Sequence, residues 1–153
     1  MHLPHHELVL RLWHYPSFDR YTSWLVYSPL AQEDANAIVV RSIWEQAFDA
    51  HRFIDPLDGL KHGFSSEPSM SLQQVELSRE KLAPRLTTLG EIAPAAFVDE
   101  PGIAIDGASF GIETAGRSFT WRDDSSESKL IAWCREFREF LQANFEPEQS
   151  DEF

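Results

Sequence analysis

Histidine is the residue type of this chain best suited to metal binding or proton transfer, and three copies lie close together at the N-terminus. His2, His5 and His6 place three imidazoles within five residues, a density that could bind zinc or nickel. Neither a cysteine nor a second histidine cluster completes such a site. The segment is therefore interpreted as a flexible terminus, and no metal or other cofactor is expected.

The remaining histidines, His14, His51 and His62, are scattered among plentiful carboxylates. Folding could bring one of them beside an acid to form a general acid–base pair. No fixed spacing such as H-E-x-x-H supports this, and the apolar neighbours of His14 favour a histidine packed in a sheet. His51 and His62 flank a turn expected at 55–59, which favours surface positions. A small enzyme or ligand-binding domain with a His/carboxylate pocket is the alternative that these residues leave open.

Motifs for nucleophilic and nucleotide chemistry are missing from the sequence. The single cysteine, Cys134, stands among Trp133 and Phe137, so a buried thiol is expected instead of a nucleophile. No G-x-S-x-G elbow occurs, and the glycines near Ser109 and Ser118 belong to expected hairpins. Neither G-x-x-x-x-G-K-[ST] nor G-x-G-x-x-G is present. The chain is therefore expected to have no catalytic residues and not to be an enzyme.

The chain is strongly acidic, with 13 Lys and Arg against 25 Asp and Glu and a formal net charge of −12. Such a surface repels phosphate backbones, which argues against nucleic-acid binding. It attracts a basic protein partner and accelerates the encounter at low salt, although solubility alone is the simpler explanation. No apolar run is long enough to cross a membrane and no secretion signal is recognisable, so a cytoplasmic location without membrane contact is expected.

Five tryptophans are many for a chain of 153 residues, and tryptophan is enriched at binding hot spots. Trp121 stands next to Arg122, Asp123 and Asp124, where a strand is expected to end. Trp121, Asp123 and Asp124 are therefore the candidate partner-binding residues, with both carboxylates facing lysines or arginines of the partner. The alternative for Trp121 is packing at the strand end beneath the last helix.

The N-terminal half is rich in β-forming runs. Glu7–Tyr15, Thr22–Tyr27 and Ala37–Trp44 are spaced as the strands of an antiparallel meander. The first run has apolar residues on both alternating faces, which predicts a strand that is central or covered on both sides. Residues 46–53 either extend the third strand or form a helical turn, and Leu72–Leu77 is a possible fourth strand.

A helix is predicted next, near 79–89, with Ser78 as its cap. Pro84 falls inside this span, so either the helix kinks there or its regular part begins at Pro84. Gly90 is the expected end of the helix. The apolar face consists of Leu82, Leu86 and Leu89.

The C-terminal part carries the strongest local signals. Asp106-Gly107 between apolar runs predicts one hairpin turn, and Ala115-Gly116 predicts a second. An amphipathic helix follows, for which Asp124 and Glu127 have capping-box spacing and Pro147 is the expected end. Its apolar positions are Leu130, Cys134, Phe137, Leu141 and Phe145.

This C-terminal pattern, from Ile103 to Phe145, resembles that of small bacterial immunity proteins of toxin–immunity competition systems. The shared features are a strand ending in Asp106-Gly107, aromatic strands ending in Trp121, a polar break and an amphipathic helix. The break differs, because a Pro-Trp-containing stretch is common there and this chain has Asp-Asp-Ser-Ser at 123–126. The resemblance implies an acidic cytoplasmic inhibitor that binds a cognate toxin such as a basic nuclease, and it transfers no catalytic residues.

Together these patterns predict a single α+β domain over 1–153, with flexible tails at 1–6 and 146–153. An antiparallel sheet is expected to be packed on one side by the C-terminal amphipathic helix and the shorter helix near 79–89. The first functional hypothesis is a non-enzymatic acidic binding protein of immunity type that occludes a basic toxin. The alternatives are the His/carboxylate pocket and a structural module whose aromatics bury a homodimer interface.

Overall fold

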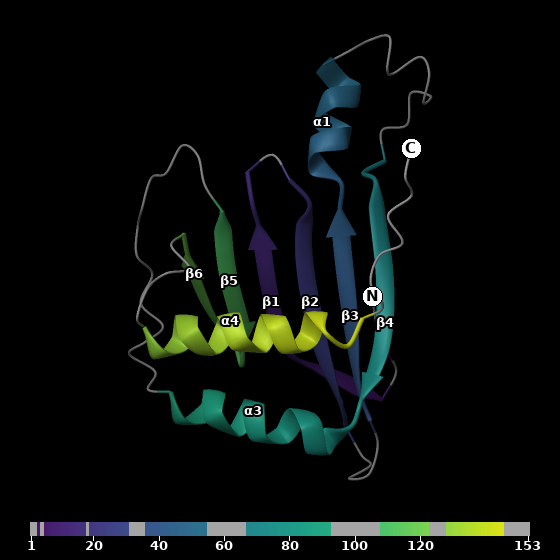
Figure 1. The fold of residues 1–153 in the computed structure, drawn as a ribbon. Helices are drawn as coiled ribbons and strands as arrows, with labels where there is room; N and C mark the ends of the chain where they lie inside the picture. The colour runs from purple at the N-terminus through teal and green to yellow at the C-terminus, as the bar shows by residue number, and fades with distance from the viewer. Residues whose placement is uncertain are drawn as a thin grey trace.

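The computed structural model describes residues 3, 5–17, 19–30, 36–54, 67–92, 108–122 and 128–145, with only the backbone for 52–54. Within these segments the chain forms a six-stranded sheet and three helices, which confirms the predicted single α+β domain (Figure 1). The strands are β1 (His6–Tyr15), β2 (Tyr21–Pro29), β3 (Ala37–Trp44), β4 (Met70–Leu77), β5 (Ser109–Thr114) and β6 (Arg117–Trp121), and the helices are α1 (Gln46–Ile54), α3 (Arg79–Glu91) and α4 (Lys129–Gln142).

The sheet has the strand order β4-β3-β2-β1-β5-β6, and all neighbouring strands are antiparallel. The predicted meander of β1, β2 and β3 is confirmed. The turn between β5 and β6 lies at Ala115 and Gly116, whose φ angles of 47° and 73° are those of a type I′ hairpin turn. The other predicted turn, at Asp106-Gly107, lies outside the described residues.

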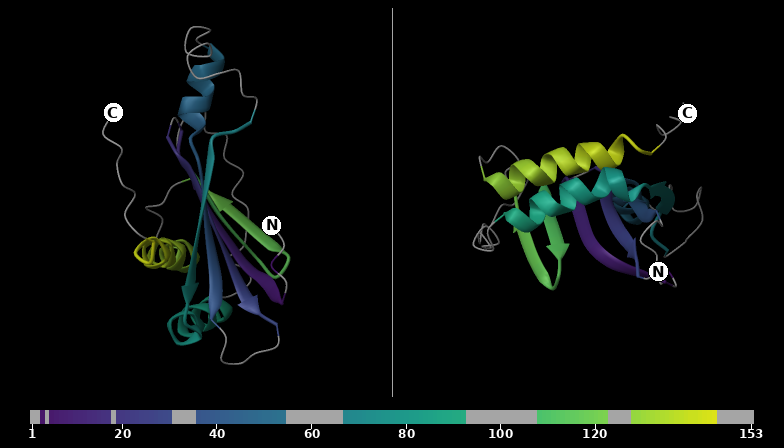
Figure 2. Two further views of the ribbon diagram at one scale, coloured as in Figure 1. Left: turned by 90° about the vertical axis from the view of Figure 1, so that its right-hand side faces the viewer. Right: turned by 90° about the horizontal axis from the view of Figure 1, so that it is seen from below.

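Helices α3 and α4 run side by side across one face of the sheet (Figures 1 and 2). They are joined by a hydrogen bond of 3.1 Å from Trp133 Nε1 to the carbonyl oxygen of Arg85. The Arg85 guanidinium also lies 3.7 Å from the centroid of the Phe140 ring. The predicted packing of two helices on one side of the sheet is therefore confirmed. None of the helices in the described segments has the length and apolar character needed to cross a membrane.

The hydrophobic core lies between these two helices and the sheet. Its most deeply buried members come from strands on one side and from α4 on the other, and Cys134 is buried among them as predicted. Burial of such side chains is the main favourable term in folding. The residues with at most 2% exposure include Leu10, Leu12, Val26, Val39, Ile112, Leu130, Phe137 and Leu141.

The helix boundaries differ from several expectations. Residues 46–54 form a helix, α1, which settles the alternative left open for this stretch. Helix α3 begins at Arg79 and continues through Pro84 and Gly90, so neither a start at Pro84 nor a stop at Gly90 is correct. Ser78 occupies the N-cap position, but its side chain makes no capping hydrogen bond; its carbonyl oxygen accepts the first bonds of the helix instead.

Helix α4 begins later and ends earlier than predicted. Its N-cap is Ser128, so the capping box of Asp124 and Glu127 is wrong, and it ends at Gln142, before Pro147. Phe145 nevertheless packs in the core as its spacing predicted, with 6% of its surface exposed.

The two expected tails have different outcomes. His6 begins β1, and the carbonyl oxygen of His5 accepts a hydrogen bond of 2.9 Å from the backbone N–H of Leu30. The N-terminal part of the fold therefore starts inside the segment 1–6. Residues 146–153 lie outside the described part of the chain.

Candidate functional site

The face of the sheet opposite α3 and α4 is not covered by any helix of the described residues (Figure 2, left). Successive side chains of a strand point to opposite faces, so the residues between the core positions must lie here. We call this surface the open face. Its exposed and half-buried apolar members on strands β1 to β4 are Trp13, Tyr15, Tyr21, Leu25, Ile38, Trp44, Met70 and Leu72. Tyr27 and Val40 lie on the same face but are buried, with 7% and 2% of their surface exposed.

Four aromatic side chains form a continuous row across the open face. The ring centroids of Trp13 and Tyr15 are 6.4 Å apart, and those of Tyr15 and Tyr21 are 4.8 Å apart in a stacked arrangement. Tyr21 then meets Trp44 edge to face, with centroids 5.3 Å apart. All four side chains are half-buried. The row crosses from β1 through β2 to β3, so it depends on strand register and not on a single local segment.

Arg11 and Gly111 hold one end of this row. The Arg11 guanidinium donates a hydrogen bond of 3.2 Å to the Tyr15 hydroxyl and lies 5.4 Å from the Trp13 ring centroid. Trp13 pairs with Gly111 across β1 and β5, and a Cβ at Gly111 would collide with the indole. Glycine is therefore needed at this position for the indole to lie close to the sheet.

A buried carboxylate holds the other end of the row. Asp49, which is 4% exposed, accepts a hydrogen bond of 2.7 Å from Trp44 Nε1. It also accepts bonds of 2.7 Å from both the backbone N–H and the hydroxyl of Ser69. These bonds connect α1, the end of β3 and the residue before β4, and they fix the orientation of the Trp44 ring.

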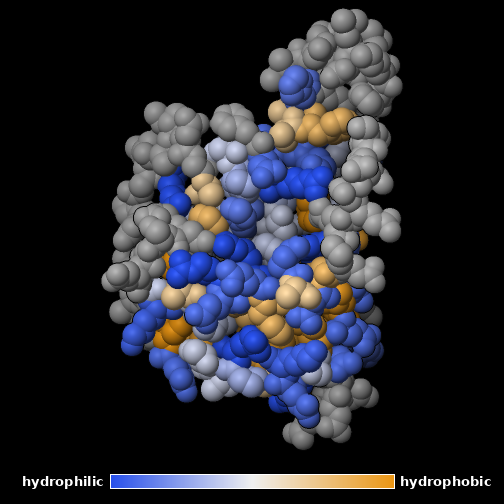
Figure 3. Space-filling model, in the orientation of Figure 1, coloured by the Kyte–Doolittle hydropathy of each residue, from blue (hydrophilic) through white to orange (hydrophobic). Residues whose placement is uncertain are grey.

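Aliphatic side chains extend the open face beyond the aromatic row. Met70 and Leu72 on β4 are 54% and 62% exposed, and Leu8 on β1 is 44% exposed. The opposite, helix-bearing side of the molecule is mostly hydrophilic, with hydrophobic residues in separate patches (Figure 3). Half-exposed tryptophan and tyrosine next to exposed aliphatic side chains are typical of protein-binding surfaces.

Comparisons of this chain with protein-family models, with curated proteins and with solved structures return no match. The function is therefore argued from the geometry of the chain itself.

The negative charge is distributed unevenly along the chain. Of the 25 acidic residues, 14 lie in the segments outside the described residues, whereas only one of the 13 basic residues, Lys61, lies there. Acidic and basic residues are nearly balanced in the described part. The net charge of −12 thus comes from segments such as 93–107, 123–127 and 146–153.

Of the candidate residues Trp121, Asp123 and Asp124, the structure describes Trp121. Trp121 is 4% exposed and stacks on Phe110 and Phe119, with centroids 5.8 Å and 5.5 Å apart. This burial favours packing at the strand end, the second of the two roles considered for it. Asp123 and Asp124 lie outside the described residues, so their partner contacts stay a prediction.

The histidines of the alternative hypothesis do not converge in the described structure. His14 stacks on Phe110 with centroids 4.5 Å apart, on the helix-bearing side of the sheet. His51 is exposed on α1, and His62 lies outside the described residues. No group of three or more His, Cys, Asp or Glu residues suited to a metal ion occurs in the part of the chain that the structure describes.

The aromatic row was missed by sequence reasoning, although its signal was present. Large apolar residues on both alternating faces of the first run were interpreted as a strand that is central or covered on both sides. Central position is correct for β1, yet helices α3 and α4 cover only one face of the sheet. The surplus of apolar residues on the second face marks the candidate site.

Proposed function

We propose that this chain is a non-enzymatic binding protein whose open face contacts a basic protein partner. The observation that carries the proposal is the row Trp13, Tyr15, Tyr21 and Trp44, extended by exposed Met70 and Leu72. The immunity-type role implied by the C-terminal pattern is the form of this function that we favour. The partner is then a basic toxin, which the protein neutralises by covering its working surface.

Two physical terms support a basic protein as the occupant. Burial of aromatic and aliphatic side chains from the open face supplies affinity, because such groups dominate the energetics of interfaces. The net charge of −12 supplies attraction at a distance, which raises the association rate at low ionic strength. A second copy of this acidic chain would be repelled by the same charge.

Site-specific photo-cross-linking tests the proposal. p-Benzoylphenylalanine is placed at Met70 or Leu72 on the open face, and at Thr87 or Glu136 on the exposed surfaces of α3 and α4 as matched controls. After irradiation in the source cells, mass spectrometry of the cross-linked product identifies the partner protein, which is then purified by itself. We expect the two open-face positions to capture the same basic protein and the two helix positions not to capture it.

Three results would overturn the proposal. The basic protein could be captured from the helix positions alone. The open-face positions could instead capture a second copy of this chain, or they could give no protein adduct. The second result would instead support the homodimer alternative.

A further inference from the structure

Strand β4 forms one edge of the sheet, and its outer side pairs with no strand of the described residues (Figure 1). Its inner side pairs with β3 over all eight residues of the strand, without a bulge. Just before β4, the backbone N–H of Glu45 continues this ladder with a 3.0 Å hydrogen bond to the carbonyl oxygen of Ser69. This bond fixes which residues of β4 bond to β3 and which face outward.

Opposed residues of an antiparallel pair alternate between those that bond to each other through the backbone and those that do not. Since Ser69 is bonded to β3, so is every second residue after it, and the residues between them direct their N–H and C=O groups away from β3. No hydrogen bond from another described residue reaches these outward backbone groups. We call them the β4 edge; they belong to Met70, Leu72, Gln74 and Glu76.

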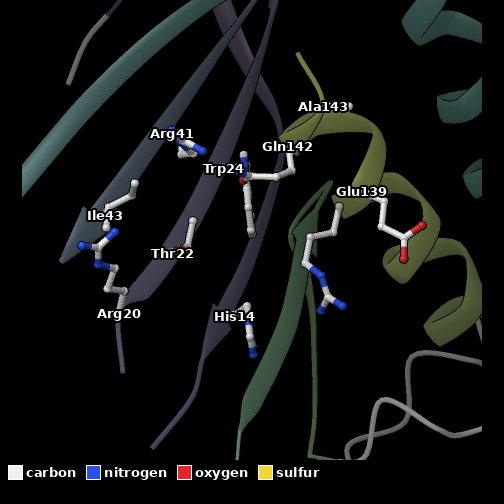
Figure 4. A pocket seen from close by; sticks show the side chains of 10 residues that line it. His14, Arg20, Thr22, Trp24, Arg41, Ile43, Glu139, Gln142 and Ala143 are labelled. Carbon is white, nitrogen blue, oxygen red and sulfur yellow. The ribbon is translucent and has the colours of Figure 1, made fainter. Parts of the chain in front are cut away.

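The side chains next to the β4 edge differ between the two faces of the sheet. Gln73 lies on the helix-bearing side, where its Oε1 accepts a hydrogen bond from Arg41, a residue that lines the cavity between the sheet and the end of α4 (Figure 4). Met70 and Leu72 are exposed on the open face. Because opposed residues of neighbouring strands share a face, an added strand would cover both side chains with its own.

The β4 edge lacks the features that protect strand edges from pairing with other chains. Natural edge strands are protected by short length, by proline or by charged residues, lysine above all. The opposite edge of the sheet, β6, has five residues and begins with Arg117. In contrast, the eight residues of β4 include no proline, lysine or arginine, and a single acid, Glu76. The β4 edge is therefore the side of the sheet that is open to a further strand.

The charge along the β4 edge favours a basic strand over a second copy of this chain. Residues 67–78 contain two acids, Glu67 and Glu76, and neither lysine nor arginine. Both acids are exposed, and the Glu76 carboxylate accepts a 3.3 Å hydrogen bond from Asn36, a neutral donor. A second copy that paired through its own β4 would bring the same two acids and no base. A lysine or arginine opposite Glu76 would instead form a favourable cross-strand pair.

We propose that an extended strand of the basic partner pairs with the β4 edge and continues the sheet. The inference rests on the proposed function, because it states how the partner engages this side of the open face. The added strand runs antiparallel, as all neighbouring strands of the sheet do. It carries apolar side chains opposite Met70 and Leu72 and a basic one opposite Glu76. In complexes of this kind, backbone hydrogen bonds supply affinity and the alternate side chains supply specificity.

The test uses the synthetic peptide acetyl-Lys-Thr-Thr-Thr-Val-Thr-Ile-amide as the probe. An antiparallel arrangement places its Lys opposite Glu76, its Val opposite Leu72 and its Ile opposite Met70. Water-exchange NMR on the ¹⁵N-labelled full chain measures the amides of β4 one by one. With the peptide at about four times its Kd, the outward amides should exchange about fivefold more slowly, because the unbound fraction falls as 1/(1 + [L]/Kd). The alternate amides, which already bond to β3, should keep their exchange rates.

Two matched pairs separate strand pairing from contact through side chains alone. N-methylation of the peptide Val removes a donor directed at β4 and should abolish binding, whereas N-methylation of the Thr that follows it should not, because that N–H faces away. Gln74→Pro removes an outward N–H at an edge position where proline is tolerated, and it should weaken binding about tenfold relative to Gln74→Ala. If Gln74→Pro prevents folding, the two methylated peptides test the same point on the unaltered chain.

Equal binding of the two methylated peptides would overturn the proposal, as would unchanged exchange of the outward amides at millimolar peptide. Protection of these amides that rises with the concentration of the chain alone would assign the β4 edge to a second copy and overturn it too. Unchanged exchange together with capture of a basic protein at Leu72 would refute strand addition and leave the proposed function in place. Absence of that capture would refute the proposed function, whatever the peptide does.

Discussion

The two faces of the sheet are built from the same strands but have different surroundings. On one face Leu10, Leu12 and Val39 are buried beneath α3 and α4, with at most 2% exposure. On the other, Trp13, Tyr21 and Trp44 are half-exposed, Tyr21 meets Trp44 edge to face, and Trp44 Nε1 donates a hydrogen bond to Asp49. The comparison shows that the same strands bury one apolar face beneath helices and leave large apolar side chains of the other face part-exposed, and this exposure is what supports the proposed recognition surface.

This difference predicts that substitutions on the covered face reduce stability most. Phe137 of α4 is 1% exposed and stacks on Trp133 with centroids 4.6 Å apart. Phe137→Ala should lower the free energy of unfolding by about 3–5 kcal/mol, because it removes buried apolar surface and leaves a cavity. Urea denaturation measures the effect, and a loss below about 1 kcal/mol would contradict the core assigned to this face.

The buried carboxylate at the edge of the open face should give the next largest effect. Asp49→Ala leaves the Trp44 N–H and the Ser69 N–H and hydroxyl without their acceptor. The expected loss is about 2–3 kcal/mol, in line with the removal of buried hydrogen bonds to a charged group. Urea denaturation gives the stability, and the Trp44 indole N–H resonance should shift in the same variant. An unmoved resonance would show that Asp49 does not orient the ring.

A matched pair of glycine substitutions tests the close contact beneath Trp13. Gly111→Ala should destabilise the protein by about 1–3 kcal/mol, because the new methyl group collides with the indole. Gly90→Ala, in α3 where a Cβ would meet nothing within 4 Å, should instead stabilise it by about 0.5–1 kcal/mol. Thermal unfolding compares the two variants, and equal signs would refute this explanation of Gly111.

The exposed ion pair between Arg20 and Glu45 should matter least. Arg20 and Glu45 are 52% and 39% exposed, so solvent screens their 2.8 Å contact. Arg20→Gln should change the free energy of unfolding by less than about 0.5 kcal/mol. A loss above about 1.5 kcal/mol in urea denaturation would assign Arg20 a structural role that its exposure does not suggest.

Much of the fold could be predicted because it depends on local patterns. Alternation located β1 and β3, the Ala115-Gly116 turn defined a hairpin, and the spacing of Leu130, Phe137 and Leu141 identified α4. Helix ends were less predictable, because Pro84 and Gly90 are accommodated inside α3 where packing outweighs local preference.

The candidate site could not be predicted in the same way, because it depends on pairing between strands. Tyr15 meets Tyr21, and Tyr21 meets Trp44, only through the register of β1, β2 and β3. Asp49 likewise finds its partner twenty residues later, at Ser69. Single-strand periodicity contains no information about such neighbours.

The most direct test of the open face as the binding surface is a calorimetric titration with the partner protein that cross-linking identifies. The purified partner is titrated against two variants of this chain, each of which gains one positive charge. Leu72→Arg alters the open face, and Thr87→Arg alters the exposed surface of α3; both positions are exposed, so folding should be preserved. We predict that Leu72→Arg weakens binding about tenfold or more relative to Thr87→Arg, which reports the charge effect alone. Equal affinities of the two variants would contradict the assignment of recognition to this face.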